Sequence, residues 1–343
     1  MIGIIGEERG IGMKRLRWGI LGCAAIADRA VIPAVLASET GELVGVASRN
    51  EEKAKAKAEE FGIPKHYGSY EALLADPDID AVYMPLPNHL HKEWTIAAAK
   101  AGKHILCEKP LAMNAAEAQE MVDACKEAGV HLAEAFMYRH HPRIARVKEI
   151  VASGEIGAIR AIRGVFTYNG AANKTDIRQV KEWGGGGLYD VGVYPLSAAR
   201  WIVGAEPEAV TVHAMFSPEH DNVDMMASGL VEFAGGVALT FDCGMWASFR
   251  NELEIVGTEG TIVLKPSFLP NKENDTIVVQ VGGETRTEGP YGVDAYVAQS
   301  DQFARVVWGE EAPLFSAQDA VENMKLIDAC LASARQRQRV VMG

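Results

Sequence analysis

Short apolar runs alternate with amphipathic segments through the first 137 residues of the chain. Each run has the length of one buried strand, and each amphipathic segment has apolar residues at helical spacing. Strands that alternate with helices favour a parallel sheet wound by right-handed crossovers. The predicted strands are 17–21, 43–47, 80–84, 104–107 and 131–135, and the predicted helices are 51–61, 70–75, 90–101 and 115–128.

The pattern changes after residue 156, where β-branched and aromatic residues recur in short stretches between turn residues. These stretches predict a large, mainly antiparallel sheet. A glycine-rich helical insertion at 184–204 interrupts it, and 316–335 form a last amphipathic helix with Ser316 as N-cap. We expect this last helix to pack back on the first region.

The composition is that of a folded protein with enough apolar residues for two domains: 343 residues, 48% hydrophobic and 23% charged. A formal net charge of -12 disfavours nucleic acid and anionic membranes as partners. Five cysteines without CxxC spacing indicate neither a disulfide framework nor a zinc ribbon. No stretch approaches the roughly 20 apolar residues of a membrane span, and no signal peptide is evident, so we expect a cytoplasmic protein. Residues 1–13 precede a more usual opening strand and are interpreted as an N-terminal extension.

A turn of small residues follows the first predicted strand, at the place where dinucleotide-binding proteins hold pyrophosphate. Small residues are needed there for a tight turn, for close approach of the backbone to phosphate and for packing of helix on strand. Gly22, Ala24 and Ala27 occupy these positions, with alanine instead of glycine at the second. The amides of Ala24, Ala25 and Ile26 would face the phosphates from a helix N-terminus. We therefore predict that these residues bind the cofactor.

The end of the second predicted strand indicates which dinucleotide binds. NAD enzymes usually have an acid here for the ribose 2′-hydroxyl, whereas this chain has Ser48 and Arg49. A guanidinium can pair with a phosphate in bidentate fashion, and the serine hydroxyl adds a hydrogen bond. NADP is therefore the expected cofactor and NAD the alternative. The competing interpretation is that Arg49 is an ordinary solvated cation.

The segment PLPNHLH follows the third predicted strand of the first region. Its two prolines restrict the backbone and leave the amide of Asn88 able to face the nicotinamide ribose. His89 and His91 are as consistent with capping or packing as with chemistry, and His91 is retained as a candidate cofactor contact. The adjacent histidines at 140 and 141 have no carboxylate or cysteine at ligand spacing, so no metal site is predicted.

The segment HILCEKP places Glu108 and Lys109 at the carboxyl end of a buried strand. Loops after parallel strands are where α/β enzymes place their chemistry. Glu108 can hold Lys109 or a ligand hydroxyl, and Pro110 fixes the turn, through a cis bond if X-Pro adopts one. The alternative is an ordinary exit from a strand with a solvated Glu-Lys pair.

The glycine-rich insertion is the second candidate region. Four glycines at 184–187 are interpreted as allowing the backbone to approach a flat ligand. Asp190 and Tyr194 are four residues apart, which places them on one helical face with Cβ atoms roughly 5 to 6 Å apart. Trp183 can form a wall of the same pocket. A partly buried helix with Asp190 as a cap is the structural alternative.

With GILGCAAIA, VASRN, PLPNHLH, EKPLA, AEAFMYRHHP, WGGGGLYDVGVY and LEIVGTEGTI in this order, the chain resembles the Gfo/Idh/MocA family from about residue 17 to 303. The resemblance implies an α/β fold: an N-terminal Rossmann domain with a parallel sheet, then a C-terminal α/β domain with a large, open, mainly antiparallel sheet. We expect the Rossmann domain at 14–137, with helix 316–335 packing on it, and the substrate and oligomerisation domain at 138–315. The open face commonly forms dimers in this family, so a homodimer or homotetramer is expected.

The resemblance also implies roles for single residues. It implies that Lys109 is a catalytic lysine and that Glu108 and Lys109 contact the cofactor. Many relatives have histidine where this chain has Tyr194, so the chain looks like the branch with glucose-fructose oxidoreductase, NADP-dependent D-xylose dehydrogenase and dihydrodiol dehydrogenase. Arg178 in DIR also looks like that branch and, with Trp183, is a candidate cofactor contact.

These residues suggest reversible hydride transfer between NAD(P) and the carbinol or lactol carbon of a sugar or diol, most plausibly C1 of an aldose. In this hypothesis the Lys109 ammonium lowers the pKa of the Tyr194 phenol so that it can act as a base. Asp190 orients Lys109 or accepts a substrate hydroxyl. A dihydrodiol or dicarbonyl oxidoreductase is the alternative enzyme, and an NADP-sensing regulator without turnover is the alternative outside enzymes.

Overall fold

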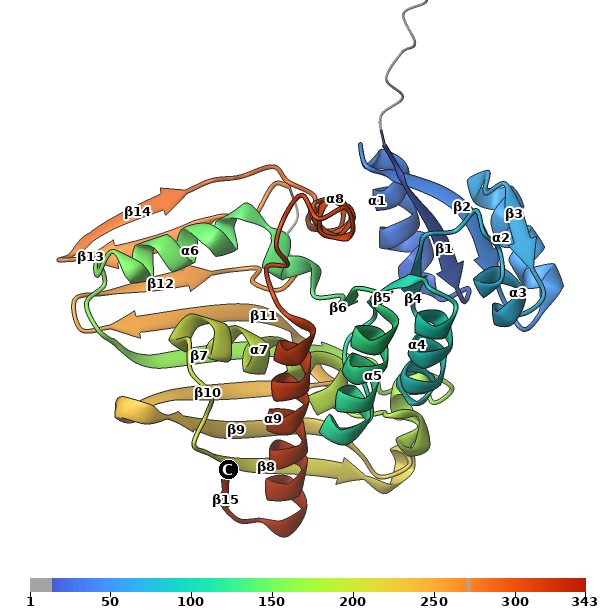
Figure 1. Cartoon of the computed structure of the whole chain (residues 1–343). Helices are drawn as coiled ribbons and strands as arrows, with labels where there is room; N and C mark the ends of the chain where they lie inside the picture. Colours follow the sequence, from blue (N-terminus) through green and yellow to red (C-terminus); the bar gives the residue numbers. More distant parts are fainter. Residues whose placement is uncertain (1–13, 270–271) are drawn as a thin grey trace, which may run out of the picture.

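Two sheets organise the chain (Figure 1). The computed structural model describes residues 14–269 and 272–343, and the predicted extension 1–13 lies outside them. The predicted fold class is confirmed: a six-stranded parallel sheet precedes a nine-stranded, mainly antiparallel one. Within the described ranges, no helix combines the length and the apolar character needed to cross a membrane.

The parallel sheet has the strand order β3-β2-β1-β4-β5-β6. The order reverses direction beside β1, and such a switch point leaves a crevice at the carboxyl ends of the strands where ligands bind. Asn50 and Asn114 cap the second and fifth helices by accepting from the backbone N–H three residues on. The strands and helices are β1 (Leu16–Leu21), β2 (Gly41–Ala47), β3 (Lys65–Tyr67), β4 (Ala81–Met84), β5 (His104–Cys107), β6 (Leu132–Glu134), α1 (Ile32–Ala37), α2 (Glu51–Phe61), α3 (Tyr70–Leu74), α4 (His91–Lys100) and α5 (Ala115–Ala128).

Helix α8 (Ala295–Val307) belongs to the parallel sheet, although its sequence lies far along the chain. It contacts α1 and β2, and the ring of its Phe303 lies 5.3 Å from that of Trp18 on β1. The predicted assignment of all of 138–315 to the second domain is therefore wrong for α8. The chain passes between the two sheets through the short turn Met137–His140, where the predicted boundary falls.

The second sheet has the order β14-β13-β12-β11-β7-β10-β9-β8-β15. Only β7 and β10 pair in parallel among its described neighbours, and the other pairs are antiparallel. Its strands are β7 (Ile159–Asn169), β8 (Ala209–Ser217), β9 (Val223–Phe233), β10 (Val237–Gly244), β11 (Trp246–Gly257), β12 (Gly260–Leu264), β13 (Ile277–Val281), β14 (Glu284–Glu288) and β15 (Val340–Val341).

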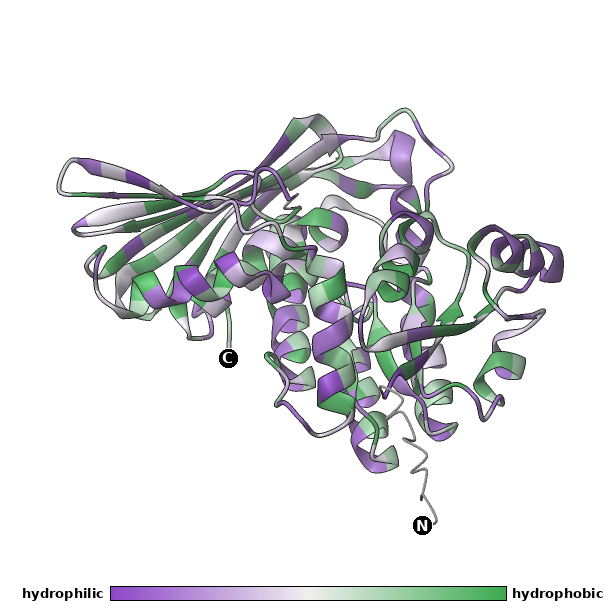
Figure 2. Ribbon diagram, turned by 90° about the horizontal axis from the view of Figure 1, so that it is seen from above, coloured by the Kyte–Doolittle hydropathy of each residue, from purple (hydrophilic) through white to green (hydrophobic). Residues whose placement is uncertain are grey.

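Helices cover one face of this sheet, and the other face is open (Figure 2). The covering helices are α6 (Pro142–Ala152), α7 (Val193–Val203) and α9 (Ala317–Gln336). Along β7, Ile162 and Phe166 are buried, whereas Arg163 between them is exposed. This alternation is typical of a strand with one face on a core and one face toward solvent.

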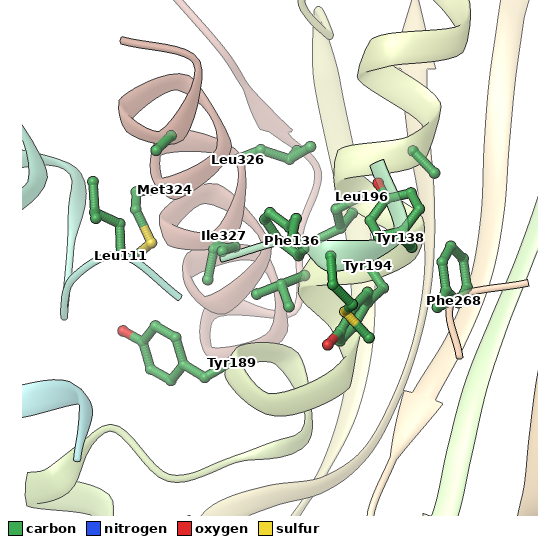
Figure 3. Packing of buried hydrophobic residues seen from close by; sticks show 14 of the residues in the cluster. Leu111, Phe136, Tyr138, Tyr189, Tyr194, Leu196, Phe268, Met324, Leu326 and Ile327 are labelled. Carbon is green, nitrogen blue, oxygen red and sulfur yellow. The ribbon is translucent and has the colours of Figure 1, made fainter. Parts of the chain in front are cut away.

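Helix α9 packs against both domains. It contacts α5 of the parallel sheet on one side and β8 and α7 on the other (Figure 1). In the core, Met324 and Ile327 of α9 lie beside Leu111 and Phe136 (Figure 3). The expectation that the last helix packs on the first region therefore describes only one side of α9, which joins the two sheets through one continuous core.

Candidate active site

A cleft of about 760 Å³ lies where the switch point of the parallel sheet meets the second domain. Residues that follow β1, β4 and β5 form one side of the cleft, and residues of the second domain form the other. The carboxyl ends of these strands are where α/β proteins bind their ligands. The residues of this cleft that bear on its chemistry are Ala24, Ala25, Ile26, Asn88, Glu108, Lys109, Arg178, Trp183, Asp190 and Tyr194.

The turn after β1 fits a dinucleotide. Gly22 has φ 118°, a conformation that side chains rarely adopt, and a Cβ there would lie 3.0 Å from the Leu86 side chain. The helix that follows begins at Ala25 and includes a π-helical segment (Ala27–Val31); Ala24 just before it and its first residues Ala25 and Ile26 line the cleft. Free amides of a helix N-terminus beside such a turn suit a pyrophosphate group.

The two residues proposed to distinguish NADP from NAD lie at the end of β2, outside the cleft lining. Ser48 is buried, and its hydroxyl accepts a hydrogen bond from the Asn50 amide at 3.2 Å. Arg49 is exposed, and its charge lies near Tyr70 and His89. The guanidinium is therefore open to solvent on the β2 side of the crevice.

Lys109 and Glu108 follow β5 and point to different partners. The Lys109 Nζ donates to the Asp190 backbone oxygen at 2.6 Å and lies 3.3 Å from its carboxylate. Glu108 accepts from the Tyr83 hydroxyl at 2.7 Å, and burial raises the pKa of this carboxyl despite the nearby Lys109 charge. The peptide bond between Lys109 and Pro110 is cis. The two residues are thus held inside the protein and do not form a solvated Glu-Lys pair.

Asp190 is the centre of the polar network. Arg178 donates to its carboxylate at 2.8 Å, and the Tyr168 hydroxyl donates at 2.7 Å. Burial acts to raise the pKa of Asp190, but the charges of Lys109 and Arg178 outweigh burial and lower this pKa. The carboxylate is therefore ionised, and it holds both cations in the cleft.

Tyr194 contributes its ring to an aromatic cluster with Phe136, Phe166 and Phe268 (Figure 3). The Lys109 Nζ lies 5.0 Å from the centre of this ring. The two side chains, which come from different domains, thus meet at one cleft. Such a distance is typical of a cation-π contact.

The predicted effect of Lys109 on the phenol is wrong. Burial raises the pKa of Tyr194 well above its usual value, and the charges of Glu108 and Asp190 raise it further. The Asp190 carboxylate offsets the charge of the Lys109 ammonium, so Lys109 does not lower this pKa. Tyr194 is therefore a neutral phenol at physiological pH.

The four glycines of 184–187 are required by the protein's own packing, so their predicted role toward a flat ligand is wrong for three of them. A Cβ on Gly185 would lie 2.5 Å from the Arg178 backbone oxygen, and one on Gly187 would lie 2.9 Å from Gly244. Gly186 has φ 125°, and a Cβ there would lie 2.1 Å from the Asp224 carboxylate. Among the four, Gly184 alone lines the cleft.

Asp224 anchors this tract. It is buried on β9, and its Oδ2 accepts from the Leu188 amide at 2.7 Å. The amide begins a π-helical turn (Leu188–Gly192) that carries Asp190 and runs directly into α7. Asp190 and Tyr194 are thus on one continuous helical segment, and Pro195, which has no N–H to donate, lies just after its π-helical turn.

Replacing Gly186 with alanine is expected to destabilise the fold because the new methyl group would meet Asp224. The left-handed conformation alone costs about 1–2 kcal/mol for a non-glycine residue, and overpacking a buried site adds about 1–3 kcal/mol. Gly204→Ala is the matched control, since Gly204 has φ 71° and open space around it. Chemical denaturation should show a larger loss for Gly186→Ala, and equal losses would contradict the packing account.

The prediction that His91 contacts the cofactor is wrong. Its side chain is fully buried, with Nε2 2.8 Å from the Leu86 carbonyl oxygen and Nδ1 3.0 Å from that of Pro110. His91 therefore links the loops after β4 and β5. Asn88 donates to the Gly184 carbonyl at 2.8 Å, and Trp183 stacks on His89 with ring centres 5.6 Å apart.

The structure adds residues that the sequence did not indicate. Tyr168 and Phe166 of β7 line the cleft, as do Phe249 and Leu269, which are 62% and 38% exposed. These residues lie on strands and loops whose sequence predicts only sheet, so no local motif identifies them. Alternation along β7 would have indicated which residues face the helices, but not that they reach the cleft.

A dinucleotide-binding sheet whose switch-point cleft contains a lysine, a carboxylate and a neutral phenol defines the class of NAD(P)-dependent oxidoreductases. Residues 16–136 match the model of an oxidoreductase family with an NAD-binding Rossmann fold, and residues 144–263 match the Gfo/Idh/MocA C-terminal domain. The chain belongs to the Gfo/Idh/MocA family and is an NAD(P)-dependent oxidoreductase.

Named relatives cover three quarters of the chain or more. It is 40% identical over 321 residues to D-xylose 1-dehydrogenase (NADP(+)) 2 of Haloferax volcanii, covering 93% of this chain and 97% of that protein. It is 34% identical to trans-1,2-dihydrobenzene-1,2-diol dehydrogenase of Mus musculus, covering 75% and 77%. The structure resembles a 3-ketoreductase from Actinomadura kijaniata in complex with NADP and TDP-benzene, with TM-score 0.88, 32% identity and coverage of 93% and 98%.

Proposed function

We propose that this oxidoreductase uses NADP and interconverts a carbinol and a carbonyl on a sugar or cyclic diol, with C1 of an aldose as the first candidate. The convergence of Lys109, Asp190 and Tyr194 on one cleft at the switch point is the observation that supports this proposal most strongly. The named relatives support the same substrate class, because they include a D-xylose dehydrogenase and a dihydrodiol dehydrogenase.

The side chains of the cleft supply the proton chemistry. When bound, the nicotinamide cofactor accepts or supplies the hydride. As a carbonyl is reduced, its oxygen must gain a proton, and Tyr194 is a neutral donor because its pKa is raised. In the opposite direction the phenolate form of Tyr194 takes the hydroxyl proton as hydride leaves, so oxidation requires that the phenol has first released its own proton to solvent. Lys109, fixed by Asp190, is a second donor for the substrate oxygen.

The substrate end of the cleft suits a molecule with an apolar face. Ile177, Trp183, Phe249 and Leu269 line it, and each has more than a third of its surface exposed. Sugar rings and cyclic diols combine such a face with hydroxyl groups. The Arg178 guanidinium is engaged by Asp176 and Asp190, so it is not free for a substrate phosphate. These features favour a neutral substrate.

A panel of aldoses, polyols, cyclic diols and dicarbonyls, assayed with both cofactors by NAD(P)H absorbance, tests the proposal. Turnover of at least one neutral sugar or diol with NADP is expected. Turnover of dicarbonyls alone would favour the alternative enzyme. Binding of NADPH without turnover of any compound would favour the NADP-sensing regulator, and it would contradict the catalytic proposal.

Replacing Arg49 with alanine is expected to weaken NADPH binding at least tenfold and to leave NADH binding within about twofold. The guanidinium is exposed at the end of β2, where a 2′-phosphate would pair with it, and a charge-assisted pair of this kind contributes about 1.5–3 kcal/mol. Fluorescence titration of both nucleotides measures the effect, with NADH as the internal control. Equal weakening of both nucleotides would contradict a 2′-phosphate contact.

The open face of the second sheet is proposed to join copies of this chain in a dimer or tetramer. It forms a shallow hollow of about 500 Å³ around Arg163, Val165 and Thr240, without a helix over it. Val165→Glu together with Thr240→Glu should therefore shift the molecular mass in light scattering toward a monomer. Leu36→Glu, on the exposed side of α1, is the control. A monomeric wild-type protein would contradict the proposal.

A further inference from the structure

A second cavity, of about 310 Å³, lies beside the edge strand β6 and shares no lining residue with the Lys109 cleft. Helices α5 and α8 and the residues before α9 enclose it. Most of its lining is apolar, as shown by Val130, Leu132, Phe303 and Phe315. Its volume is at the lower end of small-molecule sites, which run from about 300 to 1,000 Å³.

Two polar atoms of residues that line this cavity are buried and have no hydrogen-bond partner among the described residues. They are Oε2 of Glu134 and Nδ1 of His140. Arg139, on the same cavity, differs because it donates to Asp319 at 2.7 Å and to Ser197 at 2.6 Å. A buried polar group without a partner costs about 1–3 kcal/mol, so both orphaned atoms call for a polar partner inside the cavity.

We propose that this cavity is a second ligand site, which takes a small apolar molecule bearing a hydroxyl or amino group that donates to Oε2 of Glu134. The apolar lining suits the body of such a molecule, and His140 gives its polar group a second partner. Burial raises the pKa of Glu134 to about 7 and lowers that of His140 to about 3, so His140 is neutral. A hydroxyl matches Glu134 in either protonation state, and an amine matches its ionised form.

Glu134 also connects this cavity with the loop that contains Lys109. Its other oxygen, Oε1, accepts from the Leu111 amide at 2.9 Å, two residues beyond Lys109. A ligand on Oε2 would fix the orientation of the carboxyl group and, through Leu111, the position of the loop. The ligand would therefore modulate turnover. This coupling rests on the proposed function, whereas binding in the cavity does not.

Ligand-observed NMR on the full chain tests the site with benzyl alcohol, benzylamine and toluene as probes. Benzyl alcohol and benzylamine are expected to bind at least tenfold more tightly than toluene. Glu134→Gln keeps an acceptor for Leu111 but turns an N–H group toward the cavity, so it should abolish the preference for benzylamine, whereas benzyl alcohol can still accept from that group. Glu117→Gln is the matched control, because Glu117 accepts from the Met113 amide outside the cavity and should retain the preference.

Equal affinity for all three probes, or no binding, would overturn the proposal and leave a cavity filled by water. Ala317→Phe, which fills the cavity from the start of α9, should lower the affinity of every probe at an unchanged melting temperature. For the coupling, saturating benzylamine should change kcat at least twofold in the wild type and not in Glu134→Gln. Unchanged kcat with retained binding would overturn the coupling alone, and an absence of any turnover would count against the proposed function alone.

Discussion

Replacing Lys109 with methionine is expected to lower kcat/KM by about 10²–10⁴, the range of a lost proton donor or electrostatic contact. Methionine retains the length and the apolar stem of lysine but not the ammonium that lies 2.6 Å from the Asp190 backbone oxygen. Arg178 remains beside the Asp190 carboxylate, so this buried charge keeps one cation. The loss should therefore appear mainly in turnover.

Steady-state kinetics, NADPH titration and thermal unfolding on the same preparations measure this effect. Lys92→Met is the matched control, because Lys92 is a half-buried lysine of the same domain that pairs with Glu120 outside the cleft. We expect the control to retain nearly full activity. A Lys109→Met protein with wild-type kcat/KM would remove the ammonium from the mechanism.

Replacing Tyr194 with phenylalanine is expected to lower kcat by about 10²–10⁴, with NADPH affinity within a few-fold of wild type. Tyr194 is a neutral phenol beside Lys109 that can give a proton to a carbonyl oxygen, because burial raises its pKa. The ring itself packs on Phe136 and Phe166, and phenylalanine retains those contacts. Stability should therefore change little.

Tyr138→Phe provides the control for this substitution. Tyr138 lies in the same aromatic cluster (Figure 3), but its hydroxyl is hydrogen-bonded to Ser197 at 2.7 Å and does not line the cleft. Loss of this hydroxyl group should reduce the free energy of unfolding by about 1 kcal/mol and leave kcat nearly unchanged. Pre-steady-state absorbance at the NADPH band separates the hydride step from product release. Wild-type turnover in Tyr194→Phe would show that water or another group supplies the proton.

Strands with a clear apolar pattern could be predicted from the sequence, whereas elements made mainly of polar residues could not. Strands β1, β4 and β5 are mainly apolar, and they lie where expected. Strand β14 consists of charged residues and threonines, and it forms only because the turn at Gly282 and Gly283 returns the chain beside β13. Hydropathy gives no signal for such an edge strand.

Helix α8 was not predicted for a related reason. Its buried side includes Gln299, Ser300 and Gln302, which interrupt the apolar stripe that marks a helix in sequence. These polar side chains are buried because tertiary packing overrides local pattern. Its place on the parallel sheet was beyond prediction, since it depends on contacts between segments about 285 residues apart, such as Trp18 and Phe303.

For the site, the sequence predicted several residues that line the cleft, but not the environment that sets their pKa values or the direction of their side chains. Lys109, Asp190 and Tyr194 could be predicted because each lies in a motif and at an end of a regular element. The pKa of Tyr194 could not, since it depends on aromatic rings from three other parts of the chain. His91 lies in the segment PLPNHLH, beside the candidate cofactor contact Asn88, yet its ring points into the protein. No spacing rule in the sequence predicts the direction of such a side chain.

The most direct test of the central claim follows a deuterium label from NADPH deuterated at C4 of the nicotinamide into the products of the substrate panel. For the wild-type protein, mass spectrometry should find one deuterium on the carbinol carbon of at least one sugar or diol product. Lys109→Met and Tyr194→Phe should bind the labelled nucleotide and transfer at least a hundredfold less. A wild-type protein that binds NADPH but transfers no label, or variants that transfer it at the wild-type rate, would contradict the account.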